Sequence, residues 1–111
     1  MTEAQLQAAI IELAQRCGYR VAHFRAAMNA RGDWRTPVAA DGKGFPDLVA
    51  VHPTRGVLWR ELKSAKGRVS PEQQAWLDVL VAAGQDAGVW RPADWLDGTV
   101  DRALGLPVHQ R

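Results

Sequence analysis

The sequence contains little sulfur, and this excludes several kinds of scaffold and site. Its 111 residues include one cysteine, Cys17, and two methionines. A single cysteine cannot close an internal disulfide, and it rules out a cysteine-rich zinc site. We therefore expect Cys17 to be a small apolar residue on the buried face of a helix.

Histidine and long apolar runs are also scarce. The three histidines, His23, His52 and His109, lie far apart without the spacing of metal ligands, so we assign none of them to a site. No apolar run approaches the length needed to cross a membrane. The N-terminus lacks the basic start and apolar stretch of a secretory signal. We therefore expect a soluble, cytoplasmic protein that does not associate with a membrane.

The chain carries no strong excess of either charge. Its formal net charge is +2 and its pI is about 9.1, a weakly basic balance that permits nucleic acid as a partner without requiring it. Apolar residues make up 47% and charged residues 23% of the chain, as in ordinary globular proteins. This length and composition predict one domain over residues 1–111, with a modest core.

Apolar periodicity predicts the order helix, three strands, helix, strand, helix. Thr2 with Gln5, and Ser70 with Gln73, have the spacing of capping boxes at the start of the first two helices. The apolar stripe of the second helix is expected to contain Trp76, Leu77, Leu80 and Val81. The expected helices span 3–17, 71–83 and 92–104, the last weakened at Gly98, and the expected strands span 19–25, 48–51, 57–63 and 87–90.

Residues 26–43 show no period and are predicted to form a long loop. The loop contains the basic residues Arg31, Arg35 and Lys43 together with Trp34. Basic side chains suit contacts with a nucleic-acid backbone, and an aromatic ring beside them can stack on an unpaired base. Trp34 fits equally well as a buried anchor in a solvated loop.

The expected strands 48–51 and 57–63 flank a Pro/Gly turn and are predicted to form a hairpin. Two carboxylates and a lysine fall at its open end. Asp47 precedes its first strand, and Glu61 and Lys63 end its second. Residues two apart in a strand share a face, so Glu61 and Lys63 point the same way. If the turn is centred on Thr54, Asp47 lies opposite Glu61, with the Cβ atoms about 5 Å apart. A turn centred half a residue away would shift this pairing.

This grouping has the chemistry of a divalent-cation site. Mg²⁺ takes one or two carboxylates, keeps several waters and accepts phosphate oxygens as further ligands. Such a cation lowers the pKa of a bound water and stabilises charge on a phosphate, and a nearby lysine can orient or deprotonate that water. Charged strand ends are common in ordinary hairpins, so the spacing alone leaves both interpretations open.

Four further polar residues each have an ordinary structural explanation, and three of them also fit a role at the site. Glu3, in the first helical turn, either compensates the helix dipole, worth about 0.3–1 kcal/mol, or reaches the cation site. Gln73 has a complete explanation as a capping partner. Lys66 and Arg68, in the short turn after Lys63, either contact phosphates or are solvated turn charges.

Three short strings together resemble a known family of nucleases. The first two, Gly44-Phe45-Pro46-Asp47 and Glu61-Leu62-Lys63, resemble the signature of the PD-(D/E)XK nucleases. With the third, from Gly67 through Ser70 to Gln73, they are similar to the G-x-P-D, E-x-K and G-x-x-S-x-x-Q elements of the VRR-NUC (virus-type replication-repair nuclease) branch. The core resemblance covers residues 44–80. It implies an α/β fold with a restriction-endonuclease-like core, in which helices flank a mixed four-stranded sheet in the order αβββαβ plus a C-terminal helix.

The resemblance also implies a function and a set of site residues. It implies a DNA endonuclease that depends on Mg²⁺ or Mn²⁺ and needs no organic cofactor. The cation would be bound by Asp47, Glu61 and the backbone carbonyl of Leu62. Lys63 would position or activate water, and Glu3 and Gln73 would lie close by. The predicted DNA-binding residues are Arg31, Arg35, Lys43, Lys66 and Arg68.

The resemblance to small, free-standing VRR-NUC proteins further implies a viral or prophage origin, cleavage of four-way (Holliday) and other branched DNA, and a homodimer. We expect Trp95 and Leu104 of the last helix to form part of the dimer surface. Two alternatives remain open at this stage. One is a DNA-binding module without catalytic activity, and the other is a sequence-specific, restriction-type nuclease.

Overall fold

The structure is a computed structural model that describes residues 1–24, 27–28, 34–35 and 39–107, with the backbone alone for 27–28 and 34–35. His109 lies outside the described residues. Among the described helices, none combines the length and apolar character that a membrane crossing requires.

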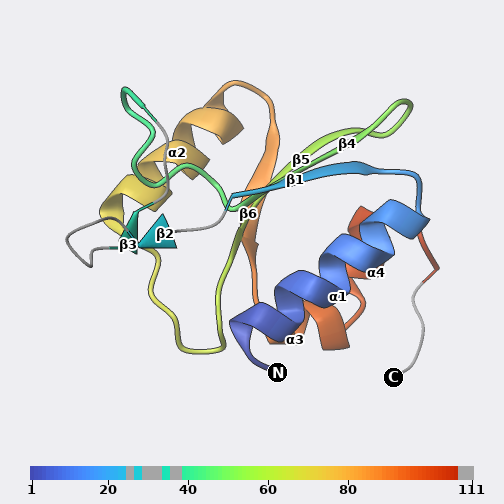
Figure 1. Cartoon of the computed structure of the whole chain (residues 1–111). Helices are drawn as coiled ribbons and strands as arrows, with labels where there is room; N and C mark the ends of the chain where they lie inside the picture. The colour runs from blue at the N-terminus through green and yellow to red at the C-terminus, as the bar shows by residue number, and fades with distance from the viewer. Residues whose placement is uncertain (25–26, 29–33, 36–38, 108–111) are drawn as a thin grey trace.

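A four-stranded mixed sheet forms the centre of the fold (Figure 1). Its strand order is β1-β4-β5-β6, in which the first three strands are antiparallel neighbours and β5 and β6 are parallel. This confirms the predicted α/β class and the predicted mixed four-stranded sheet. The strands are β1 (Arg20–His23), β4 (Leu48–His52), β5 (Gly56–Leu62) and β6 (Asp86–Trp90).

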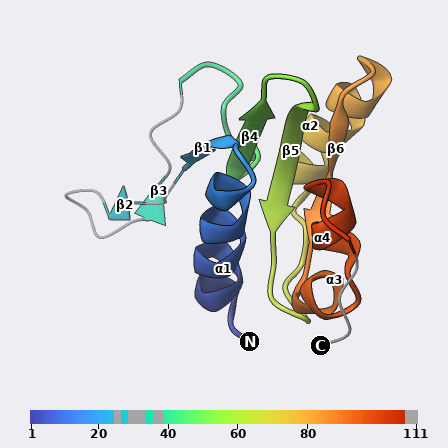
Figure 2. The same cartoon turned by 90° about the vertical axis from the view of Figure 1, so that its right-hand side faces the viewer.

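Helices cover both faces of the sheet (Figures 1 and 2). One face packs against α1 and the two C-terminal helices, and α2 lies on the other (Figure 1). Alternation along β5 separates the two sides, because Leu58 and Leu62 belong to the core beside α1 whereas Glu61 contacts α2. The helices are α1 (Glu3–Arg16), α2 (Pro71–Ala82), α3 (Pro92–Leu96) and α4 (Thr99–Ala103).

The helix boundaries follow the predicted signals closely. Both capping boxes form, with Thr2 and Gln5 at the start of α1 and Ser70 and Gln73 at the start of α2. The predicted weakness at Gly98 is a break, since this residue adopts φ 86° and divides the last helix into α3 and α4.

Two predictions about apolar residues are corrected by the structure. Val81 is 56% exposed, because it lies outside the face of α2 that buries Leu77 and Leu80. Leu104 is only 3% exposed and belongs to the core with Leu6 and Ile10 of α1. Leu104 therefore cannot form part of a dimer surface.

The predicted loop over residues 26–43 also contains regular structure. A second, two-stranded antiparallel sheet pairs β2 (Ala27–Met28) with β3 (Trp34–Arg35). Strands of two residues are too short to show an alternation of apolar and polar positions, which explains why sequence analysis predicted no strand there.

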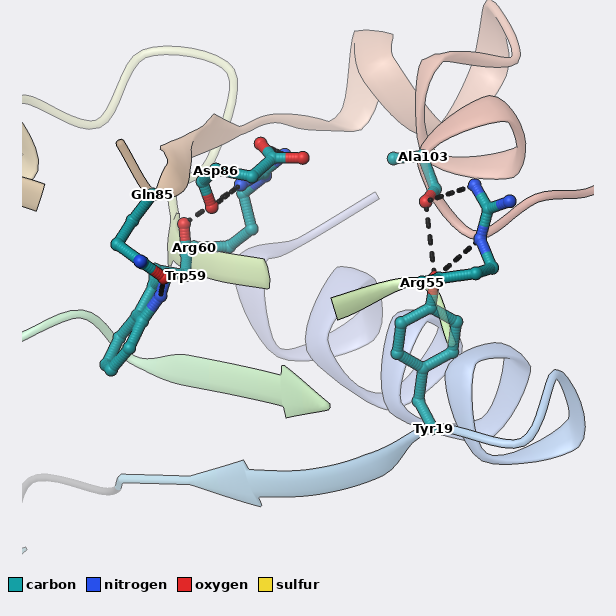
Figure 3. Close-up of polar contacts among 7 residues, drawn as sticks. All are labelled: Tyr19, Arg55, Trp59, Arg60, Gln85, Asp86 and Ala103. Atoms are coloured by element: carbon teal, nitrogen blue, oxygen red, sulfur yellow. Dashed lines mark hydrogen bonds and ion pairs between the residues drawn. The ribbon is translucent and has the colours of Figure 1, made fainter. Parts of the chain in front are cut away.

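A buried arginine pins the edge strand β6 to β5. Arg60 is 7% exposed; its Nη1 donates to the Asp86 carbonyl and its Nη2 pairs with the Asp86 carboxylate, both at 2.7 Å (Figure 3). Its guanidinium also lies 4.6 Å from the centre of the Trp90 ring. The charge is thus hydrogen-bonded and stacked, as a buried arginine requires.

A second arginine ties the tip of the β4–β5 hairpin to the C-terminal helices. Arg55 Nε donates to the Tyr19 hydroxyl at 3.1 Å, and Arg55 Nη2 donates to the Ala103 carbonyl at 3.4 Å (Figure 3). These contacts lie at the turn end of the hairpin, whereas Asp47 and Glu61 lie at its open end.

Candidate active site

The hairpin register brings the two predicted carboxylates together. His52 pairs with Gly56 and Leu48 pairs with Arg60, so the turn is centred on Thr54. Continued by one residue, this register places Asp47 opposite Glu61, which is the first of the two registers that the sequence left open.

The Asp47 carboxylate closes the end of the β4–β5 ladder. Its Oδ2 accepts a hydrogen bond from the Leu62 amide at 2.9 Å. Within a strand, the N–H and C=O of one residue point toward the same neighbouring strand. The Leu62 carbonyl therefore also faces the side on which Asp47 lies, where it can serve as a third oxygen ligand.

Glu61 is the most unusual side chain of the group. It is 2% exposed, and its Oε1 accepts a hydrogen bond from Gln73 Nε2 at 3.0 Å and lies 4.0 Å from Lys63 Nζ. Its Oε2 is buried, and no donor of the described residues reaches it. One carboxylate oxygen is thus held by the protein and the other is left without a partner.

This environment raises the pKa of Glu61 from its ordinary value of 4.5 to about 9. Burial is the largest cause, followed by the Asp47 carboxyl, which favours a shared proton over two adjacent charges. The charge of Glu3 adds to the shift, while Lys63 opposes it. Lys63 does not cancel the rise in the pKa of Glu61, because its Nζ is 4.0 Å from Glu61 Oε1 and the Glu61 carboxyl is buried.

The donor set fits a hard divalent cation. Asp47, Glu61 and the Leu62 carbonyl supply only oxygen, and the unpartnered Glu61 Oε2 is a position that a cation would satisfy. Within the described ranges, no cluster of three or more His, Cys, Asp or Glu side chains could hold a metal. Mg²⁺ does not need one, because it commonly binds through one or two carboxylates and retains several waters.

Gln73 joins the helix cap to the carboxylate pair. Its Oε1 accepts from the Ser70 amide at 2.8 Å, which completes the capping box, while its Nε2 donates to Glu61. The two ends of one amide group thus perform the two roles that the sequence left open, and the start of α2 fixes the orientation of Glu61.

Lys63 and Glu3 both lie near Glu61. Lys63 follows β5; its amide donates to the Trp90 carbonyl at 3.1 Å, and its side chain is 15% exposed. Glu3, at the start of α1, is half-buried and close enough for its charge to act on Glu61. The predicted site residues Asp47, Glu61, Leu62, Lys63, Gln73 and Glu3 are therefore neighbours in the fold.

The predicted DNA-binding residues are more scattered. Lys66 and Arg68 are exposed in the turn that follows Lys63. Lys43 is exposed and forms an ion pair with Glu72 at 3.4 Å. Arg31 and the side chains of Arg35 and Trp34 lie outside the described residues.

Gly44 is a site-forming residue whose role the sequence did not reveal. It adopts φ 84°, and a Cβ placed on it would lie 2.5 Å from the carbonyl carbon of Glu72 and 2.6 Å from the amide nitrogen of Gln73. The chain before Asp47 therefore packs directly on the backbone of α2, at the turn that carries Gln73. A glycine at this position is consistent with a positive φ. The contact with α2 cannot be predicted in the same way, because it joins residues that are distant in the sequence.

Comparison with known families gives one match. The model of the VRR-NUC domain family matches residues 34–94, more than half of the chain. The match includes Asp47, Glu61, Lys63 and Gln73, and it leaves Glu3 outside. Comparison with curated proteins and with solved structures finds no match.

Comparing alanine substitutions at Gly44 and Gly56 should separate the cost of the contact with α2 from the cost of backbone strain. Gly56 is the matched control because its φ is 92° and a Cβ there would meet nothing within 4 Å. We expect Gly44→Ala to lower the free energy of unfolding by about 1–3 kcal/mol more than Gly56→Ala, as in overpacked sites. Urea denaturation measures both. Equal losses of unfolding free energy would mean that the backbone of α2 shifts to accommodate the added Cβ at little cost.

The raised pKa of Glu61 predicts a pH-dependent stability for the metal-free protein. The folded state holds a proton that the unfolded state releases above about pH 4.5, so the free energy of unfolding should fall as pH rises from about 4.5 to about 9. One such group gives a slope of at most about 1.4 kcal/mol per pH unit. Denaturation in a chelator across this range should show the slope in the wild type and lose it in Glu61→Gln.

Glu72→Gln is the control for this measurement. The pKa of half-exposed Glu72 is lowered by hydrogen bonding to its own backbone and by Lys43, so Glu72 holds no proton that is released as the pH rises through this range. The slope should persist in Glu72→Gln. The same slope in Glu61→Gln would contradict the assignment of the titration to Glu61.

Proposed function

The chain belongs to the VRR-NUC domain family of virus-type replication-repair nucleases, and we propose that it is a divalent-metal-dependent DNA endonuclease selective for branched DNA. The observation that carries the metal dependence is the buried Glu61 carboxylate, which lies beside the Asp47 carboxyl and whose Oε2 receives no donor from the part of the chain that the structure describes. A buried carboxylate in this state must either hold a proton or neutralise a cation.

In this proposal Asp47, Glu61 and the Leu62 carbonyl hold Mg²⁺ or Mn²⁺. When bound, the cation supplies a water of lowered pKa and stabilises the charge that develops on the scissile phosphate. Gln73 keeps Glu61 Oε1 engaged, so that Oε2 faces the cation. Asp47 is oriented by the Leu62 amide, which leaves its Oδ1 for the same purpose.

Lys63 and Glu3 act beside the carboxylate pair. Lys63 places its ammonium near Glu61 without being able to bind a cation, because an ammonium has no lone pair. Its proposed role is to orient the attacking water against the phosphate and to neutralise the charge that forms there. Glu3 contributes negative potential at the site and so increases its attraction for a cation.

DNA binding in this proposal is mainly to phosphates. Lys66 and Arg68 are exposed directly after Lys63 and lie next to the proposed scissile position. Exposed Lys43 is a further proposed phosphate contact. Arg31 and Arg35 are proposed from the sequence alone, because Arg31 and the Arg35 side chain lie outside the described residues. Such contacts position a duplex or junction without reading its sequence, which distinguishes this function from a restriction-type activity.

The proposed substrate is a four-way junction cut by a homodimer in the cytoplasm of a host cell. One carboxylate pair cuts one strand, so paired symmetric cuts need two copies of the chain related by a two-fold axis. The resemblance to small VRR-NUC nucleases of viral and prophage origin supports this part of the proposal.

Substitutions at the carboxylates and at Lys63 should separate cation binding from catalysis. We expect Asp47→Asn to lower both Mn²⁺ affinity and cleavage of a labelled four-way junction, the latter by at least about 100-fold. Lys63→Ala should lower cleavage as strongly while Mn²⁺ affinity stays nearly unchanged, because its ammonium is not a ligand. Calorimetry with Mn²⁺ and a cleavage time course test the two effects.

Asp78→Asn is the matched control, since Asp78 is an exposed carboxylate of α2 that bonds only Gln74 among the described residues. It should retain both activities. Full cleavage by Asp47→Asn would exclude this pair as the cation site, and DNA binding without any cleavage by the wild type would favour a non-catalytic binding module.

Substrate selectivity should follow DNA shape and salt. We expect faster cleavage of a four-way junction than of a duplex of the same sequence, by a protein that is a dimer in light scattering. DNA affinity should fall steeply with salt and depend little on sequence. A monomer that degrades linear duplex equally well would contradict the junction assignment, and a strong preference for one duplex sequence would favour a restriction-type nuclease.

A further inference from the structure

Arg91 holds the turn that follows the proposed catalytic lysine. It is half-buried and lies directly after β6. Its Nη1 donates to two backbone carbonyls of this turn, those of Ser64 and Gly67, each at 2.7 Å. A charged donor that bridges two carbonyls three residues apart fixes both ends of the turn at once.

Little else in the described structure restrains this turn. Within it, the Gly67 amide donates to the Ser64 carbonyl at 3.3 Å, which is at the long end for a hydrogen bond. Immediately before it, the Lys63 amide donates to the Trp90 carbonyl at 3.1 Å. Two successive residues at the end of β6, Trp90 and Arg91, therefore hold the chain from Lys63 to Gly67.

The base of the Arg91 side chain is itself well fixed. Its amide donates to Asp94 Oδ2 at 2.7 Å at the start of α3, and the next residue, Pro92, is buried. The guanidinium thus projects from a rigid junction between β6 and α3. The turn that it holds directly follows Lys63, at the end of the strand that carries Glu61.

We propose that Arg91 is a positioning residue, which sets the Ser64–Gly67 turn so that Lys63 faces the scissile phosphate and Lys66 and Arg68 face the flanking backbone. This inference rests on the nuclease function proposed above, since it assigns Lys63 to catalysis. Arg91 need not touch the DNA, because its effect passes through the carbonyls of Ser64 and Gly67.

The direct test is hydrogen exchange at the Gly67 amide, followed by NMR without DNA or metal. Arg91→Met keeps an unbranched side chain and removes every donor. It should increase exchange at Gly67 by at least about tenfold and leave exchange in β4 unchanged. Arg91→Lys should restore most of the protection, because an ammonium can also donate to two carbonyls.

Arg55→Met is the matched control. Arg55 also links its side chain to a distant backbone carbonyl, that of Ala103 (Figure 3), but it lies at the turn end of the β4–β5 hairpin. The Arg55→Met substitution removes the same charge and should leave both Gly67 exchange and junction cleavage at wild-type values. If Arg91→Met fails to fold, Arg91→Gln replaces it, since the shorter amide side chain cannot reproduce the charged bridge.

The cleavage arm links the turn to catalysis. Arg91→Met should lower kcat by about tenfold or more, as expected when a catalytic group is misplaced, with a smaller rise in KM, and Arg91→Lys should recover most of kcat. Unchanged exchange at Gly67 in Arg91→Met would overturn the proposal. So would a loss confined to DNA affinity, with the salt slope reduced by about one charge, because that pattern marks a direct phosphate contact.

The hydrogen-exchange and cleavage measurements distinguish a failure of this inference from a failure of the proposed function. If the wild type cleaves no DNA, the nuclease proposal fails, and with it the assignment of Arg91 to catalysis. The exchange measurement would still decide whether Arg91 sets the turn. If the wild type cleaves and Arg91→Met cleaves equally well, the nuclease proposal stands and the positioning role is overturned.

Discussion

Burial of the Glu61 carboxylate beside Asp47 is the constraint on which the rest of the site depends. Removing an ionised carboxylate from water is costly unless its oxygens find donors or a cation, and the described residues supply a donor for only one of them. The folded chain has two ways to meet this cost, by holding a proton or by binding a positive ion. A raised pKa and an affinity for a divalent cation are therefore two consequences of the same geometry.

The contacts that stabilise the fold are also the contacts that shape this geometry. Gln73 caps α2 and holds Glu61 with opposite ends of one amide, and Gly44 allows the chain before Asp47 to pack on that same helical turn. Asp47 in turn closes the sheet by accepting from the Leu62 amide. Asp47 is thus held by the backbone of β5, and Glu61 is held by a side chain that is itself bound to the cap of α2, as a preorganised site requires.

Local patterns predicted much of this arrangement. Capping boxes and apolar periodicity are local patterns, and they predicted the main helices and the four strands of the central sheet. For the hairpin they left two registers open, and the structure selects the one centred on Thr54, which places Asp47 opposite Glu61. The failures are non-local. The burial of Leu104 depends on how α4 packs against α1, and the contact of Gly44 with α2 joins segments separated by the whole hairpin. Strands as short as β2 and β3 leave no period to detect.

The central claim is that Asp47 and Glu61 jointly bind a divalent cation. Anomalous diffraction from crystals grown with Mn²⁺ near pH 8 tests it most directly, because Mn²⁺ scatters anomalously and accepts the same oxygen ligands as Mg²⁺. The account predicts one strong peak within ligand distance of Asp47 Oδ1, Glu61 Oε2 and the Leu62 carbonyl, with Gln73 still bonded to Glu61 Oε1. A Mn²⁺ peak elsewhere, with a hydrogen bond between the Asp47 and Glu61 carboxyl groups, would contradict it.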